Sequence, residues 1–100
     1  MIKHIVAFRI KPEFAPEKKQ EIMETMKERL EALPPKITAL QSAEVGLNFN
    51  PTEAAFDVVL TTTHQTKEDL AAYAIHPDHQ EVVKYIVAHI SDRVVVDYAA

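Results

Sequence analysis

The order in which strand-like and helix-like patterns follow one another constrains the fold of this chain most. Residues 2–10 alternate between two faces that both carry apolar side chains, which predicts a first strand. Residues 56–63 and 93–98 are rich in β-branched side chains and predict two more strands. The segment 37–49 alternates irregularly and contains Gly46, which is typical of a strand with a bulge or a close backbone approach. We therefore expect four strands.

Helical periodicity separates the first strand from the second and the third from the fourth. Over residues 16–33 apolar side chains recur at helical spacing opposite a charged face, until Pro34–Pro35 stops the pattern. A short helix is expected over Thr66–Ile75, because a threonine with an acidic residue three positions later resembles a capping box. After Pro77, an apolar stripe over residues 78–90 predicts a further helical piece.

This order, βαββαβ, is that of the ferredoxin-like α+β sandwich, in which both helices cover one face of an antiparallel four-stranded sheet. The other face then lacks a cover. The runs Ile5–Phe8, Val58–Leu60 and Val94–Val96 nevertheless place aliphatic side chains on both faces. A large exposed apolar patch usually marks an interface. The sequence therefore predicts a homodimer that forms through the open sheet face.

Length and composition limit the class of protein. We expect one domain over residues 1–100, and 47% hydrophobic residues with a single glycine are typical of a compact globular chain. A net charge of -4 with interspersed signs lacks the basic stripe that nucleic acids require. The apolar run Ile5–Phe8 is too short for a signal-peptide core or a membrane span. The absence of cysteine excludes disulfides and thiolate chemistry and is compatible with a reducing compartment. Taken together, the charge and the short apolar run predict a cytoplasmic protein without nucleic-acid or membrane partners.

The segment Tyr73-Ala74-Ile75-His76-Pro77-Asp78-His79 is the strongest candidate for chemistry. Pro77 ends one helix and fits the first position of the next, which places His79 in a first helical turn. The helix dipole disfavours an imidazolium there, so His79 could act as a neutral general base next to a carbonyl. The alternative is a side chain that only bonds water or a carboxylate. Tyr73 could bond a substrate oxygen, or it could be a core residue with its hydroxyl at the surface.

The other histidines allow further interpretations. His4 shares a strand face with apolar residues, so it either faces a cavity or is a satisfied histidine at the end of the sheet. His76 and His79 are three residues apart, as metal ligands on a helix can be, but the proline between them breaks that geometry and no third ligand follows. We therefore expect no metal and no cofactor. His64 and His89 are expected at the surface.

Five segments carry a family resemblance that covers essentially the whole chain: Ile2–Val6, Glu44–Asn48, Phe56–Leu60, Tyr73–His79 and Val95–Tyr98. They resemble the stress-responsive α/β-barrel family known as Dabb. The Tyr-x-x-His-Pro-x-His piece is the specific one, and the others are generic strand patterns. The resemblance implies a homodimer whose two sheets pack into an α/β barrel, with a small cavity between sheet and helices in each subunit.

One plant branch of this family, the olivetolic acid cyclases, closes a linear polyketide by aldol condensation. There the histidine that ends the motif is the general base, and the motif's tyrosine and a histidine near the start of the first strand line the site. The resemblance thus implies His79, Tyr73 and His4 as candidate catalytic residues. A further histidine of the cyclases falls near Val58 here, so part of that site is missing and polyketide cyclisation itself is not implied.

Together these observations favour a cytoplasmic homodimer that binds a small, partly apolar, oxygen-bearing molecule beside His79. Its chemistry would be cofactor-free acid/base chemistry of the isomerase or cyclase type. The rival is a non-catalytic stress-associated dimer with a structural or ligand-binding role. An open cavity lined by His79, Tyr73 and His4 would favour the enzyme, and a cavity closed by its own side chains would favour the rival.

Overall fold

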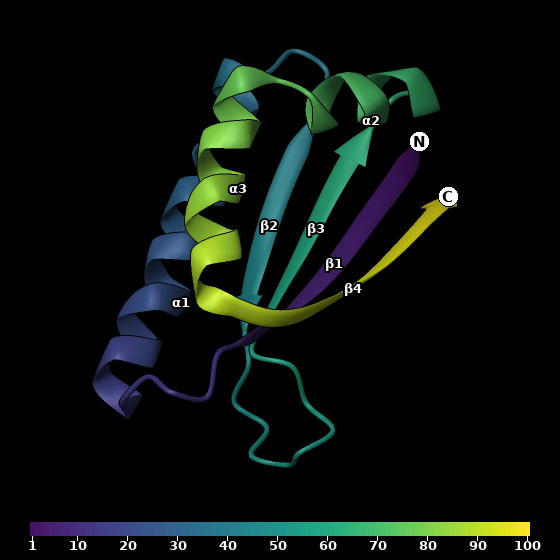
Figure 1. The fold of residues 1–100 in the computed structure, drawn as a ribbon. Coiled ribbons are helices and arrows are strands. Elements are labelled where there is room, and N and C mark those ends of the chain that lie inside the picture. Colours follow the sequence, from purple (N-terminus) through teal and green to yellow (C-terminus); the bar gives the residue numbers. More distant parts are fainter.

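The computed structural model describes residues 1–100 and confirms the ferredoxin-like element order (Figure 1). Four strands form one antiparallel sheet in the order β2-β3-β1-β4: β1 (Ile2–Ile10), β2 (Ser42–Leu47), β3 (Val58–His64) and β4 (Ile90–Ala99). The helices are α1 (Pro16–Glu31), α2 (Lys67–Ala74) and α3 (Pro77–His89), with a short 3-10 turn, η1 (Pro34–Lys36). The helices lie on one side of the sheet, which leaves the other face open.

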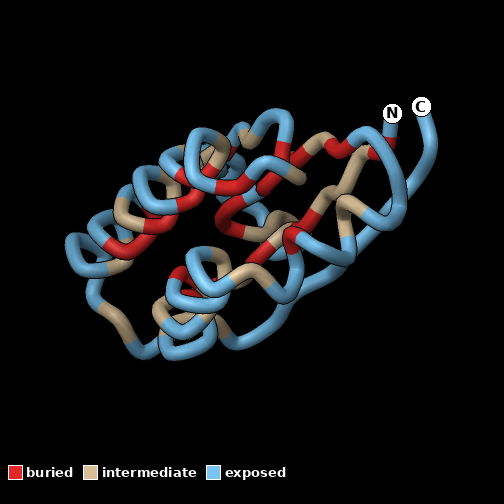
Figure 2. The backbone as a smooth tube through the Cα atoms, turned by 90° about the horizontal axis from the view of Figure 1, so that it is seen from above, coloured by how far each residue is buried: buried red, intermediate tan, exposed pale blue.

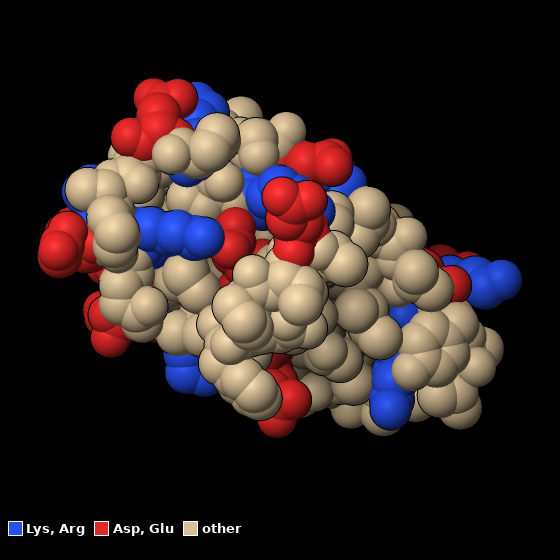
Figure 3. Space-filling model, turned by 90° about the horizontal axis from the view of Figure 1, so that it is seen from below, with Lys and Arg blue, Asp and Glu red and all other residues tan.

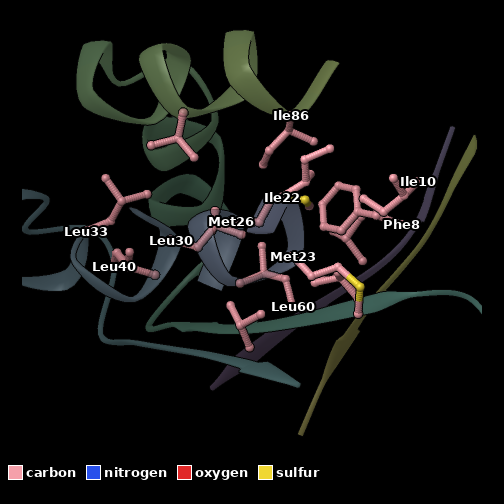
Figure 4. Packing of buried hydrophobic residues seen from close by; sticks show 14 of the residues in the cluster. Phe8, Ile10, Ile22, Met23, Met26, Leu30, Leu33, Leu40, Leu60 and Ile86 are labelled. Carbon is pink, nitrogen blue, oxygen red and sulfur yellow. The ribbon is translucent and has the colours of Figure 1, made fainter. Parts of the chain in front are cut away.

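The main core lies between the sheet and the helices. The even-numbered residues of β1 point toward the helices, and Val6, Phe8 and Ile10 among them are buried. Figure 4 shows Phe8 and Ile10 packing beside Ile22 and Ile86, which come from α1 and α3. Burial of each such side chain contributes roughly 1.5–3 kcal/mol, so this layer holds the helices on the sheet.

Two segments differ from the sequence-based expectation. The strand expected over 37–49 is shorter, because Ile37 and Leu40 are buried in the irregular connection that follows η1 and the strand begins only at Ser42. Gly46 marks a close approach and not a bulge: the β2–β3 ladder keeps its register, and a Cβ at Gly46 would lie 3.1 Å from Cγ1 of Val59. The glycine therefore lets the two strands pair closely at this point.

Strand β4 is the exposed edge of the sheet. It starts directly after α3, three residues earlier than expected, and its residues beyond Ile90 are exposed (Figure 2). Val95 lies opposite Val6 on the helix side, and Val96 lies opposite Ile5 on the open face. Both remain exposed, at 41% and 60%, because the helices do not reach over this strand. Apolar side chains are therefore exposed on both faces of β4.

The face of the molecule seen from below carries no basic stripe (Figure 3). Seen from below, lysine and arginine side chains lie among aspartate and glutamate side chains (Figure 3). This mixture agrees with the net charge of -4. None of the helices has the length and the apolar character that a membrane crossing requires.

Candidate functional site

The break between α2 and α3 brings Tyr73 and His79 into contact. Pro77 is the first residue of α3, and the side chain of His76 caps this helix by accepting a hydrogen bond from the Asp78 backbone N–H (Nδ1···N 3.1 Å). His79 therefore lies in the first turn of α3, as expected. The sharp turn places its ring 4.2 Å from the ring of Tyr73, measured between centroids.

His79 has the geometry of a proton acceptor. Its Nδ1 donates to the carbonyl oxygen of Ala74 at 3.0 Å, since a carbonyl can only accept, and in the neutral ring this leaves Nε2 with a lone pair. Burial lowers the pKa of His79 below its usual value, and the hydrogen bond to Ala74 opposes this effect. Nearby His4, Arg93 and His76 lower the pKa of His79 further. The imidazole is thus held neutral near pH 7.

Tyr73 is a core residue, but its hydroxyl is not at the surface. The side chain is buried, and the hydroxyl oxygen is shielded from solvent without a hydrogen-bond partner. Burial raises the pKa of Tyr73 to about 12, so the phenol keeps its proton and remains a donor. An unpartnered buried donor is costly in a folded protein and is a feature of sites that receive a polar group.

His4 reaches the same place from β1. Its Nδ1 donates to a carboxylate oxygen of Asp97, the residue opposite it on β4. The ring centroid of His4 lies 6.3 Å from that of Tyr73. The structure therefore brings together the three side chains His4, Tyr73 and His79, which come from β1, α2 and α3.

The expectation that His64 lies at the surface is wrong. It is fully buried at the end of β3, where its Nδ1 donates to the carbonyl of Ala39 and its Nε2 accepts from the Thr62 hydroxyl, both at 2.8 Å. Its ring lies 5.0 Å from that of Tyr73. Burial lowers the pKa of His64 below its usual value. His89 is half-buried, with its ring 4.3 Å from that of Tyr85.

No metal site is formed. The structure contains no group of three or more histidine, cysteine, aspartate or glutamate side chains in a metal-binding arrangement. His76 instead caps α3, which accounts for its position.

A small cavity of about 70 Å³ lies between the sheet and the helices. Two of the candidate residues, His4 and His79, line it, and Tyr73 does not. The remaining wall is mostly aliphatic and aromatic: Val6, Phe8, Leu30, Leu60, Val83, Ile86, Val87, Ile90 and Arg93. Val87 and Arg93 are exposed, so the cavity opens between α3 and the start of β4. It is accessible, but it is smaller than the roughly 300 Å³ at which drug-sized ligand sites begin.

A larger hollow of about 650 Å³ lies away from His4, Tyr73 and His79, around Asp57 and the loop between β2 and β3. Its charged side chains are already engaged within the chain. Asp57 accepts from the Ile10 backbone N–H at 2.7 Å and pairs with Lys19 at 2.8 Å. Arg9 lies over the Phe56 ring, 4.2 Å from its centroid. These contacts hold the end of β1 against the segment before β3 and, through Lys19, against α1. We therefore place the candidate site at His79 and not here.

Three residues of the site were not found from the sequence: His64, Arg93 and Asp97. Asp97 could be found only from strand register, which pairs it with His4 across the sheet. His64 and Arg93 join the site through tertiary packing, and no local pattern signals this.

Residues 2–100 match the Stress responsive A/B Barrel Domain family, Dabb. The chain is 37% identical, over its whole length, to a stress-response A/B barrel domain-containing protein of Arabidopsis thaliana, and it spans 37% of that protein. It is also 37% identical to a dimeric ferredoxin-like protein of unknown function from Bacteroides fragilis, with a TM-score of 0.90 over 97% of this chain and 93% of that one.

A hydroxynitrile lyase from Passiflora edulis shares the fold at 18% identity, with a TM-score of 0.80 over 97% of this chain and 90% of that one. At this identity the likeness concerns the fold alone. The family match over nearly the whole chain and the identity to the Arabidopsis thaliana protein show that this chain belongs to the Dabb family of stress-responsive A/B barrel domains.

Proposed function

We propose that the protein is a cytoplasmic homodimer that binds a small, partly apolar, oxygen-bearing molecule in the cavity beside His79 and transfers a proton there without a cofactor. The observation that carries this proposal is the hydrogen bonding and the neutral form of the His79 ring. Its Nδ1 is fixed on the Ala74 carbonyl, and burial keeps the ring neutral, so Nε2 is available as a base. The reaction class is an isomerisation or cyclisation that begins with removal of a proton next to a carbonyl.

The surroundings of His79 support the same reaction class. The wall supplies apolar contacts for the carbon part of a ligand. The ring of Tyr73 lies 4.2 Å from that of His79, and its buried hydroxyl is a donor without a partner. Dimerisation is supported by the exposed apolar residues of the open sheet face and by the dimeric relative from Bacteroides fragilis. The lyase from Passiflora edulis is an instance of an enzyme with this fold.

Exchange of carbon-bound protons for deuterium tests the proposal directly. In D2O, the wild-type protein should accelerate exchange next to the carbonyl of small ketones such as acetone and butanone. His79→Ala should slow this exchange by roughly 100-fold or more, the usual contribution of a general base. His89→Ala, which removes a half-buried histidine outside the cluster, should leave the rate unchanged.

The rival function is a non-catalytic stress-associated dimer, and the small volume of the cavity favours it. Equal exchange rates for wild type and His79→Ala would remove the role of His79 as a base. The rival would then take the place of the enzyme.

A further inference from the structure

The mouth of the small cavity carries a guanidinium that has no partner in the chain. Arg93 lies opposite Phe8 in the sheet register, on the helix side, and it forms part of the cavity wall. Its backbone N–H bonds the Asp92 carboxylate at 2.8 Å, but its side chain takes part in no hydrogen bond or ion pair. The charge is therefore free at the opening between α3 and β4.

The other two arginines of the chain are engaged. Arg9 lies over Phe56 and Arg29 over Tyr85, with distances of 4.2 and 4.5 Å from the guanidinium carbon to the ring centroid. Such contacts hold a cation by its attraction to the face of the ring. Arg93 has no ring and no carboxylate to hold it, and this separates it from the arginines that serve packing.

The cavity wall carries a positive charge and no negative one. No acidic side chain lines the cavity, and Asp97, which faces His4 across the sheet, is already bonded to it. The rest of the wall is apolar apart from the two imidazoles. A ligand that matches this wall has a short apolar stem and one negative group at the mouth.

We propose, resting on the function given above, that the cavity takes a small carboxylate anion. Its carboxylate pairs with the guanidinium of Arg93, because a planar guanidinium can donate two parallel hydrogen bonds to one carboxylate. Its stem of a few carbons lies against Val83, Ile86 and Leu60, beside His79. A volume of about 70 Å³ suits such a stem and excludes a large ring system.

The electrostatics of His79 agree with this assignment. Arg93 is one of the cations that lower the pKa of His79, so its charge acts on the imidazole. A carboxylate paired with Arg93 would offset this effect and make His79 a stronger base at the moment of binding. Ligand recognition and proton abstraction would then be coupled through one residue.

Titration of the protein with butyrate and with butyramide, followed by NMR of the histidine ring protons, tests the proposal. The two compounds have the same shape and differ in charge. Butyrate should shift the His79 signals in a saturable way, and butyramide should bind roughly tenfold more weakly or worse, because a charge-assisted hydrogen bond is lost. Arg93→Gln should remove the preference for butyrate, while Arg29→Gln, which also loses one arginine charge, should keep it.

Four outcomes overturn different parts of the proposal and can be told apart. Equal binding of the two compounds by wild type would refute the carboxylate assignment and leave the role of His79 standing, and this comparison needs no variant. Unchanged preference in Arg93→Gln would refute the role of Arg93. If neither compound shifts the His79 signals while ketone exchange still depends on His79, the anion class alone is refuted. If neither compound shifts the His79 signals and ketone exchange does not depend on His79, the proposed function is refuted as well.

Discussion

Tyr73 is surrounded by three imidazoles, and two of them resist protonation. The rings of His79, His64 and His4 lie 4.2, 5.0 and 6.3 Å from its ring. Burial lowers the pKa values of His64 and His79, so both favour the neutral form in the folded state. Each ring is also held by a carbonyl of the backbone, at Ala39 and Ala74. The packing around Tyr73 therefore favours the neutral forms of His64 and His79.

This arrangement predicts that the protein loses stability in mild acid. Below the ordinary histidine pKa of 6.5, His64 and His79 become protonated in the unfolded chain but stay neutral in the folded state, where their pKa values are lowered. The free energy of unfolding should be highest above that pH and should fall as the pH drops through the lowered pKa values. Urea denaturation at several pH values measures this fall.

The fall should be shallower in His79→Gln, which removes one of the two groups. His89→Gln serves as the control, because this half-buried residue lies outside the cluster. A wild-type free energy of unfolding that stays level or rises between neutral and acidic pH would contradict the argument.

Tyr73→Phe removes only the phenol oxygen, so it tests whether this atom contributes to stability or to function. Removal of a buried hydroxyl without a partner should leave the free energy of unfolding unchanged or raise it by about 1 kcal/mol. Ketone exchange or ligand binding should weaken, because the ring that packs against His79 loses its unpartnered donor. A clear loss of stability, measured by thermal or urea unfolding, would show that the hydroxyl is bonded within the fold.

At the scale of elements, α1 protects one edge of the sheet and the other edge stays open. The carboxylate of Glu31 accepts from the Val45 N–H at 2.9 Å, and the ammonium of Lys27 donates to the Val45 carbonyl at 2.7 Å. These groups lie on the outer edge of β2, where a further strand would otherwise add. The hydrogen bonds from Lys27 and Val45 also lower the pKa of Glu31. Strand β4 has no such cover.

Glu31→Ala should therefore destabilise the protein by about 1 kcal/mol, since it leaves the Val45 N–H without its partner. Glu24→Ala is the matched control: it is the same substitution in the same helix at an exposed position. Urea unfolding of both variants measures the difference. Equal effects of the two substitutions would show that Glu31 contributes only surface charge.

At the scale of the whole molecule, the open sheet face is unsuited to water. Val59, Val94, Val96 and Tyr98 lie on it with exposed fractions of 40% to 60%. A hollow of about 330 Å³ over Gly46 and Ala7 lies on the same face and is lined mostly by apolar residues. Exposed apolar surface of this kind is typical of a protein interface.

We therefore expect a mass of about twice the 11.3 kDa of the chain in light scattering coupled to gel filtration. Val96→Glu should give a monomer or an unfolded chain, because it places a charge in the interface. Val87→Glu changes an equally exposed valine on α3, 61% against 60%, and should keep the dimer mass. A monomeric wild type would refute the interface.

The sequence by itself determined the element order, because alternation and helical spacing are local and each sets its own backbone geometry. It also located His79 in a first helical turn, since Pro77 fixes that boundary whatever the chain packs against. Only the tertiary structure decided the partners of these residues. Asp97 reaches His4 through strand register, and His64 is buried where Tyr73 of α2 and Ala39 of the connection after η1 contact it. Arg93 reaches the cavity because β4 turns back along β1 directly after α3. Such contacts join residues far apart in the chain, so no local pattern can encode them.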